Sequence, residues 1–333
     1  AAQGAIFCVL RWIPLFRAST MLRPRVDLSR IPAFVNKQVL EAVAVKSTYL
    51  RDAVRQHGFV EIKNFIMPET AKKLRDECLA MNEKKLGFRS YEAHNLWLQS
   101  TSSDGQNADS GFSSNTSRPE ADLERELHVS KDTVFESSKT LFNMKVIDDY
   151  SEGLSPLLEL YQKSDILRDL LQDAFFADDS GNELEIGKTN LYRSADSLGG
   201  VYYNIFEKGD QLGWHFDNSE FSVNLILQEP DVGMGGQFRY FPDSRPLFDN
   251  NTASTPQATK EKIESSNSVS LPLESMLVPK LEPGTLYLFA GNRSLHDVSI
   301  VRGGRPRVNA IFTYNTKPGQ VLNEYTRKKF FGE

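Results

Sequence analysis

The sequence lacks several features that would assign it to a common class of protein. Only two of its 333 residues are cysteine, Cys8 and Cys78, which excludes a framework of disulfide bonds and agrees with a reducing environment. No segment approaches the roughly 18 consecutive apolar residues of a transmembrane helix, so we expect no membrane partner. The formal net charge of −5 argues against general nucleic-acid binding, which needs a basic face.

What the composition does contain is typical of a globular protein, with 40% hydrophobic and 25% charged residues. Residues 1–26 carry four arginines and no acidic residue, as mitochondrial transit segments do. The alternative is that Met21 is the physiological start, or that the first twenty residues are a gene-model extension. We therefore expect a cytoplasmic protein, or a mitochondrial one if residues 1–26 are a targeting segment.

Histidine is also scarce, with five residues in the chain, and two of them carry the main signal. His215 and Asp217 are two residues apart, so on a strand both side chains point to the same face and can bind one metal ion. His296 follows an apolar, strand-like run at Leu286–Phe289 and a turn, and it supplies a third ligand. Two histidines and one carboxylate leave three positions open, which is the non-haem Fe(II) site of oxygenases.

Arg307 follows on the next expected strand. Together, the His-x-Asp motif, the distal histidine and this arginine resemble the 2-oxoglutarate and Fe(II)-dependent dioxygenase superfamily. The resemblance implies that Arg307 pairs with the distal carboxylate of 2-oxoglutarate, a role that suits a planar guanidinium. It also implies Fe(II) as cofactor, with 2-oxoglutarate and dioxygen as co-substrates.

Two longer stretches extend the resemblance to prolyl-4-hydroxylase-like members of the superfamily. Gly209–Asp217 resembles their Gly-x-x-Tyr-x-x-His-x-Asp pattern, and Asp231–Pro242 resembles their Asp-Val-x-x-Gly-Gly-x-x-x-Phe-Pro segment. Leu212 occupies the place of a tyrosine that helps to bind 2-oxoglutarate in those relatives, so other groups must anchor the co-substrate here. Asn224 stands where they carry a threonine near the co-substrate carboxylate, which makes it a second candidate.

The alternation of side chains along two expected strands indicates further site residues. In Phe221–Gln228 the polar side chains recur at even positions, and they face either water or the interior of a barrel that holds an ion and a dicarboxylate. On the Arg307 strand, Asn309, Ile311 and Thr313 share the inward face, so Asn309 is a cofactor candidate and the other two are substrate candidates. An apolar Ile311 favours a small aliphatic substrate side chain. Asn218 and Arg193 are candidate contacts for the polar ends of an amino acid.

The expected fold class is mostly β with flanking helices (α+β). Residues 184–333 form a double-stranded β-helix, a jelly-roll or cupin-like core, with an insertion at about 243–279. Residues 27–183 form a helical and mixed support region that contains a polar loop at 99–121. Its expected elements are a helix over 36–57 closed by Gly58, a strand over 59–65, a helix over 68–85 and a helical region over 155–176. The remaining histidines, His57, His94 and His128, are expected at the surface.

The segment Gln211–Phe221 resembles the branch of the superfamily that acts on free amino acids, which includes hydroxylases, halogenase relatives and fungal enzymes that form an aziridine from valine. Halogenating relatives carry Gly or Ala at the carboxylate ligand, whereas this chain has Asp217. The resemblance therefore implies hydroxylation, desaturation or ring closure of a small aliphatic amino acid or a derived natural product. The alternatives are a prolyl-4-hydroxylase-like enzyme that acts on a protein and a non-enzymatic cupin-like binding module, which has no need of all four residues of the site.

Overall fold

The computed structural model of the protein describes residues 31–45, 48–99, 125–130, 133–176, 190–250 and 268–333. The N-terminal segment 1–26, nearly all of the polar loop 99–121, the expected start of the core at 184 and the middle of the insertion lie outside the described residues. None of the helices in the described part has the length and apolar character of a membrane span.

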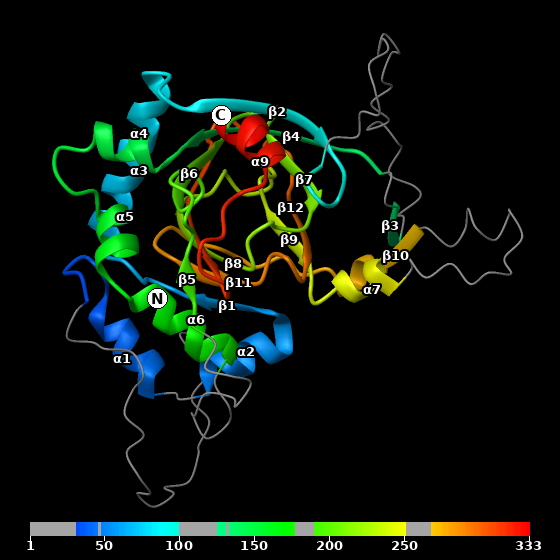
Figure 1. Ribbon diagram of the computed structural model, residues 1–333, viewed down its shortest axis with the longest axis horizontal. Helices are drawn as coiled ribbons and strands as arrows, with labels where there is room; N and C mark the ends of the chain where they lie inside the picture. Colours follow the sequence, from blue (N-terminus) through cyan, green and yellow to red (C-terminus); the bar gives the residue numbers. More distant parts are fainter. Residues whose placement is uncertain (1–30, 46–47, 100–124, 131–132, 177–189, 251–267) are drawn as a thin grey trace, which may run out of the picture.

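A single curled antiparallel sheet dominates the structure (Figure 1). Its strands are β1 (Phe59–Ile62), β2 (Phe88–His94), β4 (Phe135–Phe142), β5 (Tyr192–Arg193), β6 (Val201–Phe206), β7 (Gln211–His215), β8 (Phe221–Gln228), β9 (Phe238–Phe241), β11 (Leu286–Phe289), β12 (Leu295–Val298) and β13 (Arg307–Asn315). They follow the order β1-β11-β8-β13-β6-β4-β7-β12-β9, with β2 beside β4 and β5 beside β13. This mixed architecture around a curled half-barrel is the expected double-stranded β-helix. A separate pair, β3 (Glu126–Ser130) and β10 (Ser268–Pro272), forms a small second sheet.

Helices cover one side of the main sheet (Figure 1). They are α1 (Lys37–Val45), α2 (Tyr49–His57), α3 (Pro68–Glu83), α4 (Met144–Tyr150), α5 (Pro156–Leu158), the π-helical turn η2 (Glu159–Lys163) and α6 (Ile166–Phe176). The shorter elements α7 (Arg245–Asn250), η3 (Leu273–Ser275), α9 (Glu324–Thr326) and η4 (Arg327–Phe331) come later in the chain. Helix α2 packs against β1 and α6, and α3 packs against β8. The largest apolar core lies between these helices and the sheet.

Strand β8 shows how this core orients the barrel. Its apolar residues Val223, Leu225 and Leu227 belong to the core beneath the helices, whereas Ser222 and Asn224 line a cavity inside the barrel. Because neighbouring side chains of a strand point to opposite faces, burying the apolar set against the helices turns the polar set inward. Of the two expected orientations of this polar face, the inward one is confirmed.

The structure corrects three expected elements of the support region. The single helix over 36–57 is two helices, α1 and α2, and Thr48 directly precedes the second. The strand that begins at Phe59 ends at Ile62, since Asn64 adopts a left-handed φ of 53° that a strand cannot contain. The helical region over 155–176 is interrupted at Ser164, which has an extended backbone. The helix from Pro68 and the cap at Gly58 are confirmed.

The sequence did not predict strands β2 and β4, although both belong to the main sheet. Strand β4 pairs with β2 along one edge, and its other edge pairs first with β7 and then with β6. Three strands from residues 27–183 therefore extend the same sheet as the core. As a result, β4 carries side chains from the support region into the barrel interior.

Candidate metal centre

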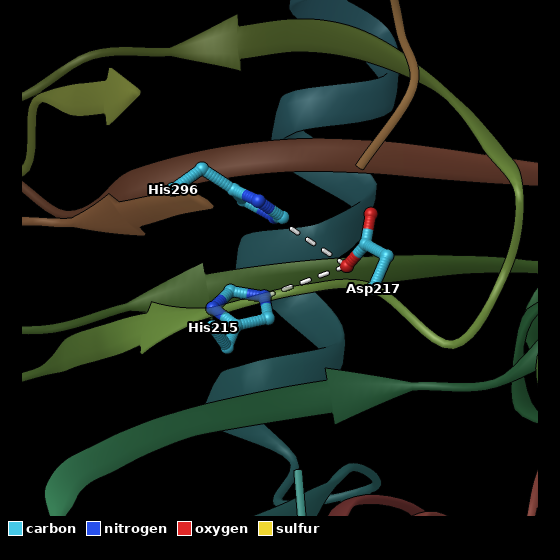
Figure 2. A group of neighbouring side chains, drawn as sticks. All are labelled: His215, Asp217 and His296. Carbon is cyan, nitrogen blue, oxygen red and sulfur yellow. Dashed lines mark ion pairs between the residues drawn. The ribbon is translucent and has the colours of Figure 1, made fainter. Parts of the chain in front are cut away.

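Three side chains from distant parts of the sequence converge on one point (Figure 2). His215 ends β7, Asp217 follows just beyond that strand, and His296 lies on β12, directly opposite His215 in the strand register. The Nε2 atoms of both histidines lie 3.4 Å from Asp217 Oδ1, and all the candidate ligand atoms lie within 4.8 Å of one another. This donor set and its open side fit Fe(II).

Each imidazole is held with its Nε2 atom free for a metal. His215 Nδ1 lies 2.8 Å from the carbonyl oxygen of Gly213, and His296 Nδ1 lies 2.9 Å from the carbonyl oxygen of Ser294. A carbonyl oxygen only accepts, so Nδ1 is the protonated nitrogen in both rings and Nε2 keeps its lone pair. Such backbone contacts orient metal-binding histidines and fix their tautomers.

The electrostatics of the cluster also suit a cation. Burial, together with neighbouring His296, lowers the pKa of His215 to about 4, so this imidazole is neutral at pH 7. Burial alone would raise the pKa of Asp217, but the two imidazoles hold the pKa of this carboxyl well below its usual range. Neutral imidazole and ionised carboxylate are the forms that bind a metal.

Asp217 lies beyond β7, so the backbone around it must hold its carboxylate in place. Its amide nitrogen donates to the carbonyl oxygen of Gly291 at 3.0 Å. A Cβ atom on Gly291 would lie 2.0 Å from Asp217 Oδ2, which is far inside van der Waals contact. Glycine at this turn is therefore what allows the carboxylate to approach the two histidines.

One cavity inside the barrel brings together the metal ligands and most of the other expected site residues. Besides the three ligands, its lining includes Arg307, Asn224, Asn309, Ile311, Thr313 and Asn218. Asn309 donates to Asn224 Oδ1 at 2.9 Å, so the two cofactor candidates from neighbouring strands are in direct contact. The inward face expected for the Arg307 strand is the face that lines the cavity.

Arg307 is 1% exposed. Its guanidinium donates to the carboxylate of Glu229 and, at 3.2 Å, to the carbonyl oxygen of Gly236. Its Nε–H is buried and has no acceptor within the described residues. A buried donor without a partner is costly in free energy, and the carboxylate of a dicarboxylic acid in the cavity would supply the acceptor. The residues present therefore fit 2-oxoglutarate.

The substrate candidates differ in their placement. Thr313 donates through Oγ1 to the carbonyl oxygen of Gly199 at 2.6 Å. Asn218 donates to Thr326 Oγ1 at 2.7 Å, a contact that ties it to the C-terminal segment. Arg193 is not among the residues that line the cavity. Its guanidinium instead donates to the carbonyl oxygens of Tyr161 and Ser164, so the structure does not bring Arg193 to the site.

Several residues at or beside this cavity were not predicted from the sequence, among them Lys139, Tyr202, Tyr287 and Glu229. Lys139, Tyr202 and Tyr287 line the cavity, and Glu229 pairs with Arg307. The position of Glu229 directly after the polar-faced strand β8 is a signal that could have identified it. No comparable signal marks Lys139, because its strand was not predicted.

His94 is also placed wrongly by the sequence analysis, since it is fully buried rather than exposed. Its Nε2 lies 2.6 Å from Ser137 Oγ and its ring centroid lies 6.1 Å from that of His215. The reason is the pairing of β2 with β4, which carries the end of β2 into the interior. His57 and His128 are exposed, as expected.

A double-stranded β-helix with two histidines and a carboxylate placed to hold one metal ion, and a buried arginine on its last strand, is the arrangement expected of a 2-oxoglutarate and Fe(II)-dependent oxygenase. Residues 201–329 match the family model described as Halogenase D. The matched segment contains the three candidate metal ligands and Arg307, and these residues fit iron and 2-oxoglutarate. Among curated proteins, none matches the sequence.

Several solved structures are similar to this chain. A Pseudomonas putida prolyl-4-hydroxylase has a TM-score of 0.40 at 14% identity, over 80% of this chain and 98% of that one. The epimerase SnoN from nogalamycin biosynthesis, in complex with Fe3+, alpha ketoglutarate and nogalamycin RO, has a TM-score of 0.46 at 12% identity, over 84% and 93%. A 2OG-Fe(II) oxygenase family protein from Burkholderia pseudomallei has a TM-score of 0.40 at 12% identity, over 82% and 92%.

Proposed function

We propose that this enzyme couples the oxidative decarboxylation of 2-oxoglutarate to the oxidation of an aliphatic C–H bond in a small amino acid or a derived natural product. The observation that carries the proposal is the cluster in which Asp217 Oδ1 lies 3.4 Å from the Nε2 atoms of both His215 and His296. When bound, Fe(II) and 2-oxoglutarate supply the oxidising power by reducing dioxygen as succinate and carbon dioxide form.

The protein's own residues supply binding and orientation. His215, Asp217 and His296 would hold the metal, and Arg307 would bind the distal carboxylate of 2-oxoglutarate. Tyr287 on β11 stands opposite Asn224 in the strand register and lines the same cavity. We therefore assign to Tyr287 the role of the tyrosine that Leu212 replaces.

Oxygenation, rather than halogenation, is the proposed outcome although the matched family model is described as Halogenase D. A halide could coordinate only if the carboxylate ligand were absent, and Asp217 occupies that position. Gly291 leaves no room for a side chain between the backbone and this carboxylate, which supports Asp217 as a positioned ligand. Hydroxylation, desaturation and ring closure are the reactions that remain.

A small aliphatic substrate suits the apolar part of the cavity. Ile311 lies on the inward face of β13, and Leu98, Leu212, Phe330 and Phe331 line the same space. Apolar walls of this kind favour a substrate whose reacting carbon carries no charge. We keep the prolyl-4-hydroxylase-like reaction on a protein as the alternative, because the segment Gly209–Asp217 resembles those enzymes.

The test loads the purified protein with Fe(II) under anaerobic conditions, adds 2-oxoglutarate with single amino acids or with proline-containing peptides, and follows succinate after air is admitted. We expect aliphatic amino acids to raise succinate above the background without substrate. If peptides alone raise it, the alternative function is correct. A chlorinated product in the presence of chloride would contradict the assignment of Asp217.

A further inference from the structure

Lys139 is a buried cation that neither the metal nor the co-substrate requires. It lies on β4, which reaches the barrel interior between β6 and β7, and it lines the same cavity as the metal ligands. The residue is 6% exposed. Its amine lies over the ring of Phe330, 5.5 Å from the ring centroid.

Within the described residues, Lys139 forms no ion pair, and Asp217 is the one anion that acts on its charge. Burial outweighs this attraction and lowers the pKa of Lys139 to about 8. His94 is close enough to interact electrostatically with the amine, but burial lowers the pKa of His94, which leaves it neutral. Once a metal occupies the site, the carboxylate of Asp217 binds that metal and its negative charge is compensated there. Lys139 then has no anion of its own among these groups.

A lysine that is buried without a partner is rare because removing its charge from water costs several kcal/mol. A bound anion offsets such a cost when it contacts the amine inside the cavity. The distal carboxylate of 2-oxoglutarate is not the best candidate for this anion. Arg307 already offers it a fork of donors, and Arg307 is coupled to Glu229 and Tyr287 rather than to Lys139.

We propose that Lys139 binds the carboxylate of the organic substrate and that the substrate is therefore an α-amino acid with a free carboxyl group. This inference rests on the proposed function. The aliphatic side chain then lies against the apolar residues of the C-terminal segment, of which Phe330 and Phe331 line the cavity. Figure 1 shows α9, at the start of this segment, close to β2 and β4, and η4 packs against β2.

Binding without turnover tests the assignment directly. The protein is loaded with Fe(II) and 2-oxoglutarate in the absence of dioxygen and titrated calorimetrically with L-valine, L-leucine and L-isoleucine. Each amino acid is compared with its amide, which keeps the amine and the side chain but lacks the negative charge. We expect at least one of the acids to bind about 10- to 100-fold more tightly than its amide, the range of a charge-assisted hydrogen bond.

Variants assign that preference to Lys139. In Lys139→Met the preference for acid over amide falls below about threefold, while the affinity for 2-oxoglutarate stays within about threefold of the native value. Lys139→Arg retains the preference because it retains the charge. Lys145→Met, a change of the same kind at an exposed lysine of α4, serves as the control. The comparison of acid with amide on the native protein needs no variant, so it holds even if Lys139→Met does not fold.

The outcomes separate the two proposals. If the native protein binds no 2-oxoglutarate and forms no succinate, the proposed function is wrong. If 2-oxoglutarate binds but each acid binds no better than its amide, or none of the three acids binds, the role of Lys139 is wrong and the proposed chemistry stands. A loss of 2-oxoglutarate affinity in Lys139→Met would assign this lysine to the co-substrate and overturn the inference.

Discussion

The cavity has two walls, and each carries one buried cation. We call Asn224, Tyr287 and Arg307, from β8, β11 and β13, the cofactor wall. We call Lys139, Tyr202, Phe330 and Phe331, from β4, β6 and η4, the substrate wall. Arg307 is paired with Glu229 inside the protein, whereas Lys139 has no ion-pair partner within the described residues.

Because of this difference, the two walls bind their ligands in different ways. Glu229 fixes the guanidinium of Arg307 and offsets part of its desolvation, and the unpartnered Nε–H remains for the co-substrate. Lys139 depends for its counter-charge on whatever enters the cavity. The cofactor wall is therefore organised before binding, and the substrate wall becomes electrostatically complete only with substrate.

The largest expected effect comes from removing the metal that both walls share. His215→Ala deletes one of three protein ligands, so we expect loss of stoichiometric iron and a fall in succinate formation of at least about 10³-fold. Iron content and succinate release measure the two effects. His128→Ala, at an exposed histidine of β3, is the control and should retain both. Undiminished turnover in His215→Ala would refute the metal assignment.

The second largest effect is expected from removing Arg307, the cation that has an ion-pair partner in the protein. Arg307→Met removes the co-substrate anchor and leaves the half-buried Glu229 without a cation, so we expect roughly 100-fold weaker 2-oxoglutarate binding and a loss of stability of about 3 kcal/mol. Calorimetric titration with 2-oxoglutarate and urea unfolding measure the two effects.

The double variant Arg307→Met with Glu229→Met distinguishes stability from binding. Replacing both charges with apolar side chains should restore most of the stability but none of the 2-oxoglutarate affinity. Recovery of both would mean that Arg307 acts only through Glu229 and does not contact the co-substrate.

The residues of the cofactor wall are easier to predict from the sequence than those of the substrate wall. Two of the three strands of the cofactor wall show clear alternation, so the sequence alone places Arg307 on an inward face and puts Asn224 on the polar face of β8. The metal ligands followed from a short motif and a distal histidine. These signals are local, because the period of a strand fixes which side chains share a face.

The substrate wall could not be predicted in the same way. Strand β4 has the sequence Phe-Glu-Ser-Ser-Lys-Thr-Leu-Phe, in which alternation is weak and Lys139 resembles a solvent-exposed lysine. Its burial depends on pairing with β2, β6 and β7, which is a contact between distant segments. His94 was misplaced for the same reason. Tertiary pairing, rather than local pattern, decides the surroundings of these residues.

Removing Lys139 should raise the stability of the protein, whereas removing Arg307 should lower it. Lys139→Met removes a buried charge that has no partner, so the ligand-free variant should be more stable than the native protein at pH 7, by on the order of 3 kcal/mol. The pKa of Lys139 is lowered to about 8 in the folded protein, against about 10.4 in an unfolded chain. Between these values the folded state binds fewer protons, so native stability rises with pH.

Urea unfolding at several pH values measures this effect. The stability difference between Lys139→Met and the native protein should shrink from about pH 8 upward and vanish near pH 10.5. Lys145→Met should show no such change. A loss of stability in Lys139→Met at pH 7 would mean that the amine has an anionic partner within the folded chain, which would remove the contrast between the two walls.

The smallest expected effect concerns how the substrate wall is held in place. Asn218, directly after the ligand Asp217, donates to Thr326 Oγ1 at 2.7 Å and so ties the segment that carries Phe330 and Phe331 to the metal centre. Thr326→Val removes the acceptor of a bond worth about 1 kcal/mol, which corresponds to a rise of about fivefold in KM for the amino acid. Because the cofactor wall lies on other strands, KM for 2-oxoglutarate should not change. Thr316→Val, which removes a hydroxyl bonded to Glu220, is the matched control and should leave both KM values unchanged. An equal rise in both KM values for Thr326→Val would show that the two walls are not independent.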